Sequence, residues 1–405
     1  GPLGRSGPPG GMASEWRAFF SRAAPLLAKS WQRAPRLAMT GETTFMGRVS
    51  LDDIAPLVDH GKMFAGSAAL GADKRSWTSA PVAGPLARSL PKSTAYVNNA
   101  GMYLPALAEV CLAAVEELGW PTTCNVYLSA PGMEVSVPPH TDRQDVFVLQ
   151  TTGTKRWTVY RPTPLGAEGT DPLRRGKEGD ALSRELLGEP LLDVVLAPGD
   201  ALYVPLGFPH ETNTCTSADG VEEGEPSVHI TLNFDSLIWG LSYRLLWAAS
   251  LRAARLASGT PDPAGEAPAA PQPEGTPWET YASLQASLHF GFLEHRPPLG
   301  FLHQQGAVVA PGSPVGHAAG NDLRARARRW GAPAEDVDIV GDEHVAVALV
   351  MLDQHRQELL RLHTRMYTDV LLDLSGLPPL ERELAHWQVL QEQMSVLKRG
   401  MGWEE

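Results

Sequence analysis

Short runs of apolar residues that alternate with polar ones, each bounded by glycine or proline, fill the middle of the chain. The runs are rich in Val, Tyr, Phe and Thr, which favour strands over helices. They are NVYLS (125–129), DVFVLQ (145–150), KRWTVY (155–160), LLDVVL (191–196), DALYVPL (200–206) and SVHITLNF (227–234). Many short strands at this spacing predict a double-stranded β-helix, the jelly-roll form of a β-barrel.

One connection within this region predicts a hairpin. The four residues 151–154 (TTGT) separate the second run from the third, and a glycine in so short a connection is typical of a hairpin turn. Because side chains alternate between the two faces of a strand, Lys155, Trp157 and Val159 are expected to share one face.

Helical periodicity is found on both sides of the β-rich region. The segment 15–27 (EWRAFFSRAAPLL) predicts a short amphipathic helix that Pro25 interrupts. Two longer periodic segments, 343–374 and 379–398, are separated by SGLPP, so one helix should end and another begin there. The predicted fold class is therefore α+β, with a jelly-roll core, N-terminal helices and a mainly helical C-terminal region.

The segment 236–256 (SLIWGLSYRLLWAASLRAARL) is apolar enough to be considered for the membrane. It contains Arg244, Arg252 and Arg255, and its apolar residues recur at helical spacing. Arginine is costly inside a bilayer, so we expect an amphipathic helix that packs on a partner or on its own copy. A dimerisation helix, and hence a homodimer, is the expectation; a membrane anchor is not.

Shifts in composition set the expected domain limits. Residues 257–277, crowded with Pro, Ala and Gly, predict a flexible linker. Residues 1–11 (GPLGRSGPPGG) are typical of a protease-cleavage remnant of an expression tag, with Met12 as the native start. The expected units are a core domain with a helical lead-in (12–235), the amphipathic helix (236–256), the linker (257–277) and a helical C-terminal region (278–405).

Composition and charge narrow the class of protein. With 405 residues, 43% hydrophobic and 20% charged, the chain is long enough for a large folded domain plus a smaller one. The net charge of -12 argues against sequence-independent binding to nucleic-acid phosphates and favours a basic partner. The 3 cysteines are scattered without a CxxC pair, which indicates no disulfide frame and a reduced intracellular compartment, cytoplasmic or, in a eukaryote, nuclear or nucleolar.

The candidate chemistry lies in the β-rich region. His140 and Asp142 are two residues apart, so on a strand their side chains project the same way, and His210 closes the later segment PGDALYVPLGFPH. Two imidazoles and one carboxylate on one face are the ligand set of non-haem Fe(II) oxygenases. A His-x-Asp spacing also occurs by chance in loops. The oxygenase interpretation therefore depends on the surrounding strands, on Lys155 after the hairpin and on PLGFPH.

These motifs resemble the JmjC-type 2-oxoglutarate oxygenases, and most closely their ribosomal-oxygenase or cupin-like branch. The similarity runs from about residue 40 to 235 and rests on NVYLSAPG, PPHTDRQDVFVLQTTGTKRWTVYRP, LAPGDALYVPLGFPHETNT and VHITLNF. The resemblance implies that His140, Asp142 and His210 hold the iron and act as the catalytic centre. It implies cosubstrate contacts for Lys155, which would bind the far carboxylate of 2-oxoglutarate, and for Asn125 and Thr231. Tyr127 is a candidate for the substrate channel.

The resemblance implies a dioxygenase that uses Fe(II), 2-oxoglutarate and O2, and that releases succinate and CO2 as it hydroxylates a protein side chain. A basic ribosomal protein is the expected substrate. Two alternatives stay open: a demethylase or oxygenase of a peptide or modified nucleotide, and a cupin-like scaffold that binds metal without turnover.

Several other ionisable residues have simpler interpretations. Asp145 should point away from the metal site, toward the surface or the surroundings of the ligands. His229 is expected to be a core histidine with its hydrogen bonds satisfied. We expect His344, His355 and His363 to lie on a solvated helix face, since a separation of 8 residues, about 12 Å along a helix, is too wide for one metal.

Overall fold

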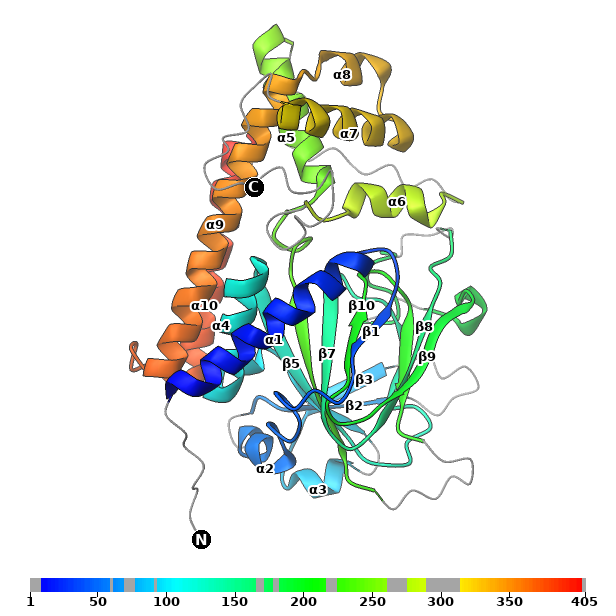
Figure 1. Cartoon of the computed structure of the whole chain (residues 1–405), viewed down its shortest axis with the longest axis vertical. Coiled ribbons are helices and arrows are strands. Elements are labelled where there is room, and N and C mark those ends of the chain that lie inside the picture. Colours follow the sequence, from blue (N-terminus) through cyan, green and yellow to red (C-terminus); the bar gives the residue numbers. More distant parts are fainter. Residues whose placement is uncertain are drawn as a thin grey trace.

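Two antiparallel sheets form the core of the structure (Figure 1). The computed structural model describes residues 9–58, 61–68, 77–90, 93–164, 171–177, 182–215, 224–260, 275–288 and 314–402. The strands are β1 (Arg36–Met39), β2 (Phe64–Ala68), β3 (Trp77–Pro81), β4 (Thr94–Val97), β5 (Thr122–Ser129), β6 (Val137–His140), β7 (Asp145–Thr152), β8 (Lys155–Tyr160), β9 (Pro190–Leu196), β10 (Ala201–Val204), β11 (His210–Asn213) and β12 (Ser227–Phe234).

Helices lie along one side of the sheets and beyond one end of them, and the short α2 and α3 lie at the other end (Figure 1). They are α1 (Pro9–Ser30), α2 (Leu51–Ile54), α3 (Leu86–Ser89), α4 (Pro105–Leu118), α5 (Tyr243–Ser258), α6 (Trp278–Gln285), α7 (Pro314–Trp330), α8 (Ala334–Ile339), α9 (Asp342–Leu372) and α10 (Pro379–Gly400), with 3₁₀ turns η1 (Ala55–Val58), η3 (Ala100–Met102) and η4 (Arg184–Leu186).

The strand order is that of a jelly roll. The larger sheet runs β1-β10-β7-β12-β5-β4-β2-β3, and the smaller one runs β6-β11-β8-β9. Apolar side chains from both sheets meet between them, among them Val148 on β7, Val159 on β8 and Leu202 on β10, all fully buried. The predicted fold class is confirmed, and the β-rich interior is a space enclosed by two sheets.

The predicted hairpin joins β7 to β8. Gly153 has φ +57°, and a Cβ built there would lie 2.6 Å from the carbonyl oxygen of Pro226, so the turn requires glycine. On β8, Lys155, Trp157 and Val159 are buried while the alternating residues are not, which confirms the expectation that the three share the inner face.

Pro25 does not interrupt the N-terminal helix, contrary to the sequence-based prediction. Helix α1 runs on to Ser30 with Pro25 inside it. Pro25 is exposed, whereas Phe19, Phe20 and Leu27 are fully buried against the core. The packing of this apolar face outweighs the one backbone hydrogen bond that proline removes.

The amphipathic helix predicted at 236–256 begins later, at Tyr243. The preceding residues form a turn in which Gly240 adopts φ +73°. Helix α5 packs against α9 and the short helices α6 to α8 of its own chain, and it buries Leu246, Trp247 and Leu251. Its apolar side is thus covered within the chain, and a homodimer through it stays a prediction. Most of the predicted linker, residues 261–274, lies outside the described residues.

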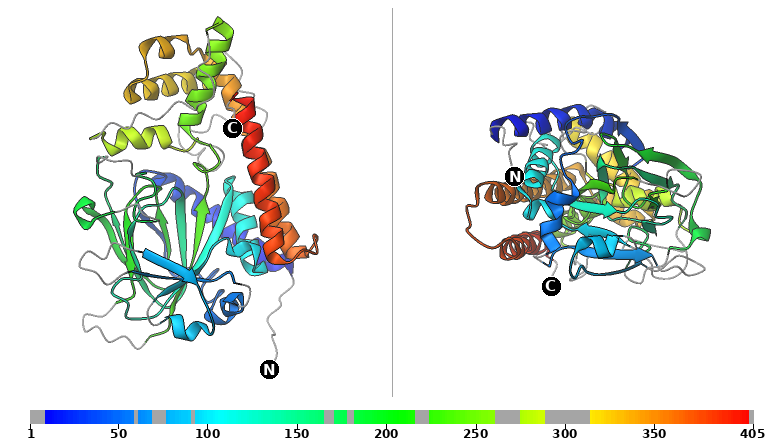
Figure 2. Two further views of the ribbon diagram at one scale, coloured as in Figure 1. Left: turned by 180° about the vertical axis from the view of Figure 1, so that it is seen from behind. Right: turned by 90° about the horizontal axis from the view of Figure 1, so that it is seen from below.

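Two C-terminal histidines are buried, so the predicted solvated face is wrong for them. Helices α9 and α10 form a long antiparallel hairpin beside α4 (Figure 2). His355 is 3% exposed and its Nε2 lies 2.9 Å from the carbonyl oxygen of Trp239; His363 is fully buried, with Nδ1 2.7 Å from the carbonyl oxygen of Leu359. A long helix packed on more than one side turns several faces inward, which periodicity alone does not reveal.

Residues 314–402 contain helices and turns and no strand. None of the described helices is long and apolar enough to cross a membrane.

Candidate metal centre and cosubstrate pocket

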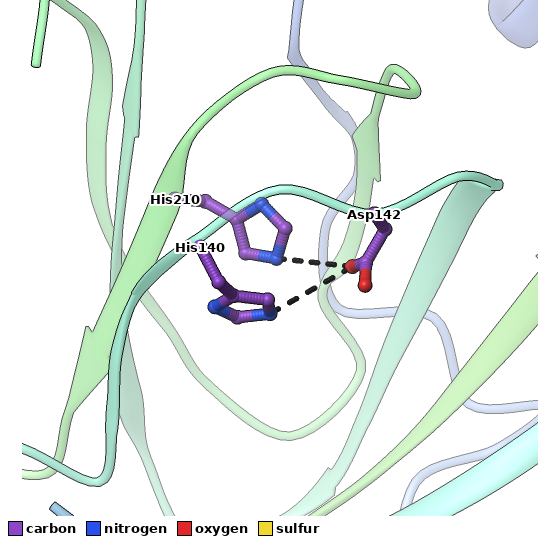
Figure 3. A group of neighbouring side chains, drawn as sticks. All are labelled: His140, Asp142 and His210. Atoms are coloured by element: carbon purple, nitrogen blue, oxygen red, sulfur yellow. Dashed lines mark ion pairs between the residues drawn. The ribbon is translucent and has the colours of Figure 1, made fainter. Parts of the chain in front are cut away.

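His140, Asp142 and His210 converge at one end of the smaller sheet (Figure 3). β6 and β11 pair in antiparallel register with His140 opposite His210, and Asp142 follows in the turn after β6. One oxygen of Asp142 lies 3.3 Å from Nε2 of His210 and 3.8 Å from Nε2 of His140. Candidate donor atoms of all three lie within 4.8 Å of one another, close enough for one ion to bind all three. No other such group occurs among the described residues.

Backbone carbonyls orient both imidazoles. Nδ1 of His140 lies 2.9 Å from the carbonyl oxygen of Pro138, and Nδ1 of His210 lies 3.0 Å from that of Phe208. A carbonyl only accepts, so each Nδ1 donates to its carbonyl, and each Nε2 faces Asp142 (Figure 3). Burial, the neighbouring His210 and Lys177 hold the pKa of His140 well below its usual range, so this ligand is neutral.

A hydrogen bond from a glycine turn links the segment of His210 to that of Asp142. The backbone N–H of Gly207 donates to the carbonyl oxygen of Asp142 at 2.8 Å. Gly207 has φ +72°, and a Cβ there would lie 2.3 Å from the ring of Trp278 on α6. The glycine of PLGFPH therefore allows both the left-handed turn and the close approach of α6, and His210 follows directly.

The ammonium of Lys177 lies beside the carboxylate of Asp142 and offsets part of its charge. Its ammonium contacts Asp142 Oδ1, and its segment is held in place because Thr141 and Arg175 exchange hydrogen bonds at 3.0 and 2.7 Å. Burial alone would raise the pKa of Asp142, but Lys177 and the two histidines outweigh it and lower this pKa well below its usual range. Lys177 contacts Oδ1, whereas the oxygen nearest the two histidines is Oδ2, so the ammonium leaves that oxygen open to an ion.

The three ligands border a cavity of about 310 Å³ between the sheets. Its wall includes Lys155, which is fully buried, and the Lys155 Nζ donates to Ser129 Oγ at 2.9 Å. Burial lowers the pKa of Lys155 to about 7. Among the described residues no carboxylate pairs with Lys155, and such a buried lysine suits an anionic ligand, because an anion would restore the stability of the charged form.

Buried polar atoms near Lys155 that have no hydrogen-bond partner among the described residues also support a bound ligand in this cavity. Trp157 Nε1, His229 Nδ1 and Thr231 Oγ1 are buried on residues that line the cavity, and none has a hydrogen-bond partner among the described residues. The donor set His140, Asp142 and His210 suits Fe(II), and a cavity with a cation at one side suits a dicarboxylate such as 2-oxoglutarate.

The remaining predicted site residues also lie on this cavity. Asn125 and Tyr127 come from β5 and Thr231 from β12, with Asn125 opposite Thr231 in the register. The ring of Tyr127 stacks on that of His229 with centroids 5.0 Å apart, and burial raises the pKa of its hydroxyl well above the usual range.

Two residues differ from expectation. Asp145 does point away from the cavity but is fully buried, not at the surface, and accepts hydrogen bonds from Tyr203, Gln32 and the backbone of Leu206. His229 lines the cavity with Nδ1 unpartnered among the described residues, so it is not the satisfied core histidine that was expected.

Ser129 and Lys177 were not identified from the sequence. Ser129 ends a predicted strand, and alternation from Tyr127 could have placed it on the inner face. Lys177 lies in an irregular segment whose position depends on contacts with Thr141. No local pattern could have revealed it.

Comparisons with known proteins agree with this site. Residues 105–232 match the family model described as JmjC domain. The bifunctional lysine-specific demethylase and histidyl-hydroxylase NO66 of Drosophila yakuba is 38% identical over 135 residues, which are 33% of this chain and 18% of that protein. The protein of the same name from Drosophila melanogaster is 36% identical, again over 33% of this chain and 19% of the relative. The chain therefore spans less than two thirds of the length of these relatives.

Among solved structures, Escherichia coli ycfD is similar at 21% identity and a TM-score of 0.40, over 63% of this chain and 62% of that one. A structure of this ribosomal oxygenase with cobalt and 2-oxoglutarate has 22% identity and a TM-score of 0.38, over 63% and 61%. The family model covers the strands β5 to β11 and most of β12, and with them all three candidate metal ligands. Over residues 105–232, this chain is similar to the JmjC domain.

Proposed function

We propose that this chain is a dioxygenase that uses Fe(II), 2-oxoglutarate and O2 to hydroxylate a side chain of a protein, with release of succinate and CO2. The observation that carries the proposal is the convergence of His140, Asp142 and His210 beside a cavity that contains the fully buried Lys155. A scaffold that merely binds metal has no need of a buried lysine in the same cavity.

The metal and the cosubstrate, when bound, supply the chemistry that inserts one atom of O2 into a C–H bond and the other into succinate. The chain contributes position and exclusion of water. His140 and His210 would bind the ion through Nε2 and Asp142 through its carboxylate, whose Oδ2 faces both imidazoles. Lys155 would hold the far carboxylate of the cosubstrate, with Ser129 keeping the ammonium in place.

A protein side chain as substrate is supported by the names of the relatives, a histidyl-hydroxylase and lysine-specific demethylase. The net charge of -12 supports a basic protein. Removal of a methyl group from lysine is the second candidate, because the same relatives carry that activity in their name. Both reactions begin with attack on a C–H bond and need the same ligands.

The test is to incubate the protein with Fe(II), 2-oxoglutarate and a cell lysate and to compare peptide masses with those from Asp142→Ala. Hydroxylation adds the mass of one oxygen atom to a peptide, whereas demethylation removes the mass of a methylene and releases formaldehyde. Succinate formation that persists in Asp142→Ala would exclude this site as its source.

A further inference from the structure

Glu383, on the C-terminal helix α10, binds residues of the jelly-roll domain. Its side chain is 12% exposed. One carboxylate oxygen accepts from Asn99 Nδ2 at 3.0 Å; the other accepts from Lys62 Nζ at 3.2 Å and from the hydroxyl of Tyr103. Burial alone would raise the pKa of Glu383, but these hydrogen bonds outweigh it and lower the pKa. A carboxylate with donors from separate segments fixes their relative positions.

Asn99 is the donor that leads from Glu383 toward the cavity. It lies in the turn between β4 and η3 with φ 51° and ψ 39°, a left-handed conformation that is unusual for a residue other than glycine. Such a conformation persists where the surroundings hold it. The bond from the side chain of Asn99 to Glu383 is one of those restraints, and Asn98, the residue before it, lines the cavity.

The backbone of Asn99 in turn orients the amide of Asn125. The N–H of Asn99 donates to Asn125 Oδ1 at 3.1 Å. Because that bond occupies the amide oxygen, the NH₂ group of Asn125 is left to donate to the neighbouring Tyr127. This hydrogen bond lowers the pKa of Tyr127, although the larger effect of burial raises it. Asn125 and Tyr127 both line the cavity that holds the candidate metal ligands.

We propose that Glu383 is a positioning residue for the cavity. Through Asn99 it fixes the amide orientation of Asn125, so that the hairpin of α9 and α10 contributes to the geometry of the site. The role of Asn125 in cosubstrate binding rests on the proposed function, whereas the link from Glu383 to Asn125 rests on the contacts alone. A purely structural salt bridge with Lys62 would stabilise the fold without affecting the Asn125 amide.

Nuclear magnetic resonance of the full chain, labelled with ¹⁵N only in asparagine, tests the link directly. In Glu383→Ala the backbone signal of Asn99 and the side-chain signal of Asn125 should shift, and their hydrogen exchange should accelerate about tenfold or more. Glu383→Gln, which keeps an acceptor for Asn99, should give smaller changes. Glu381→Ala removes an exposed carboxylate from the same helix and should leave both signals in place. Unchanged Asn125 signals in a folded Glu383→Ala protein would overturn the proposal; if that variant does not fold, Asn99→Gly, which removes the side-chain bond to Glu383 and tolerates φ 51°, decides by the same criterion at Asn125.

Calorimetry with Mn(II) and 2-oxoglutarate gives the second readout. Glu383→Ala and Asn125→Ala should each weaken 2-oxoglutarate binding about three- to tenfold, the size of one orienting hydrogen bond. In the double variant the two losses should not add, since both act through one amide. Fully additive losses contradict the proposal. Failure of the wild-type protein to bind 2-oxoglutarate would instead contradict the proposed function, and the asparagine signals would still decide the role of Glu383.

Discussion

Lys155 is the residue whose charge depends most on what occupies the cavity. Its folded pKa, about 7, lies below the usual 10.5 because of burial. The folded protein therefore binds fewer protons than the unfolded chain between these two values, and Lys155 lowers stability progressively as the pH falls through that window. A bound carboxylate would reverse the effect by favouring the ammonium.

Binding of 2-oxoglutarate should therefore take up a proton. At about pH 8 Lys155 is mostly neutral in the free protein and charged in the complex, so uptake should approach one proton; at about pH 6 it should be near zero. Calorimetry of the Mn(II)-loaded protein in two buffers with different heats of ionisation measures this number. Lys155→Met should abolish the uptake and raise the apparent KM for 2-oxoglutarate far more than it lowers thermal stability. Equal uptake in wild type and Lys155→Met would exclude Lys155 as the anchor.

The positive charge of Lys177 lies on the carboxylate that would bind the metal, so its removal should tighten metal binding. Lys177→Met should lower the dissociation constant for Mn(II) about three- to tenfold, because a partly exposed ammonium on Oδ1 of Asp142 no longer repels the ion or draws charge from the carboxylate. Electron paramagnetic resonance of free Mn(II) provides the measurement. Arg156→Met is a matched control, since Arg156 pairs with Asp193 on the outer face of β8. Weaker binding in Lys177→Met would show that the ammonium supports the metal site.

At the scale of elements, the turn before β11 sets the position of His210. Gly207→Ala should destabilise the protein by about 2 kcal/mol or more and weaken Mn(II) binding, because the new Cβ meets Trp278 and the hydrogen bond to Asp142 is strained. Thermal unfolding and Mn(II) titration measure the two effects. Gly132→Ala shares the left-handed backbone, φ +73°, but has open space at its Cβ. It should cost about 1 kcal/mol and leave Mn(II) binding intact. If Gly207→Ala lowered stability and Mn(II) binding no more than Gly132→Ala does, the role of the turn would be contradicted.

The strands that the sequence predicted differ from those it missed in what stabilises them. β5, β7, β8 and β12 bury continuous or alternating apolar faces, which a local pattern reveals. β6 has the sequence VPPH and β11 the sequence HETN, neither of which favours a strand. β6 can contain two prolines because it lies at the edge of its sheet, and both strands owe their form to pairing with each other and, for β11, with β8.

At the scale of the whole molecule, metal and cosubstrate should stabilise the fold, since their ligands come from segments far apart in the chain. Mn(II) and 2-oxoglutarate, each at about a hundred times its dissociation constant, should each add about 2.7 kcal/mol and raise the unfolding temperature by about 3 °C, so that both together raise it by about 6 °C. Scanning calorimetry with each ligand alone and with both measures the shift. His140→Ala should show no shift with Mn(II); an equal shift there would place the ion elsewhere.

The C-terminal region shows where sequence patterns fail for the molecule as a whole. Periodicity predicted both long helices nearly to the residue, yet it assigned His355 and His363 to solvent and gave no function to Glu383. Which faces of a helix are buried depends on how many elements surround it. Here α4, α5 and α10 pack against α9, and α10 also reaches η3 near the cavity.

The sequence by itself determined the strands with buried apolar faces and the inward side of Lys155, because alternation along a strand and a glycine hairpin are local properties of the chain. Only the tertiary structure decided that His210 lies opposite His140 and that Glu383 binds Asn99. It also decided that Ser129 contacts Lys155 and that Lys177 contacts Asp142. These contacts join segments distant in sequence. Their formation depends on burial and hydrogen bonding across the whole molecule, which no local pattern encodes.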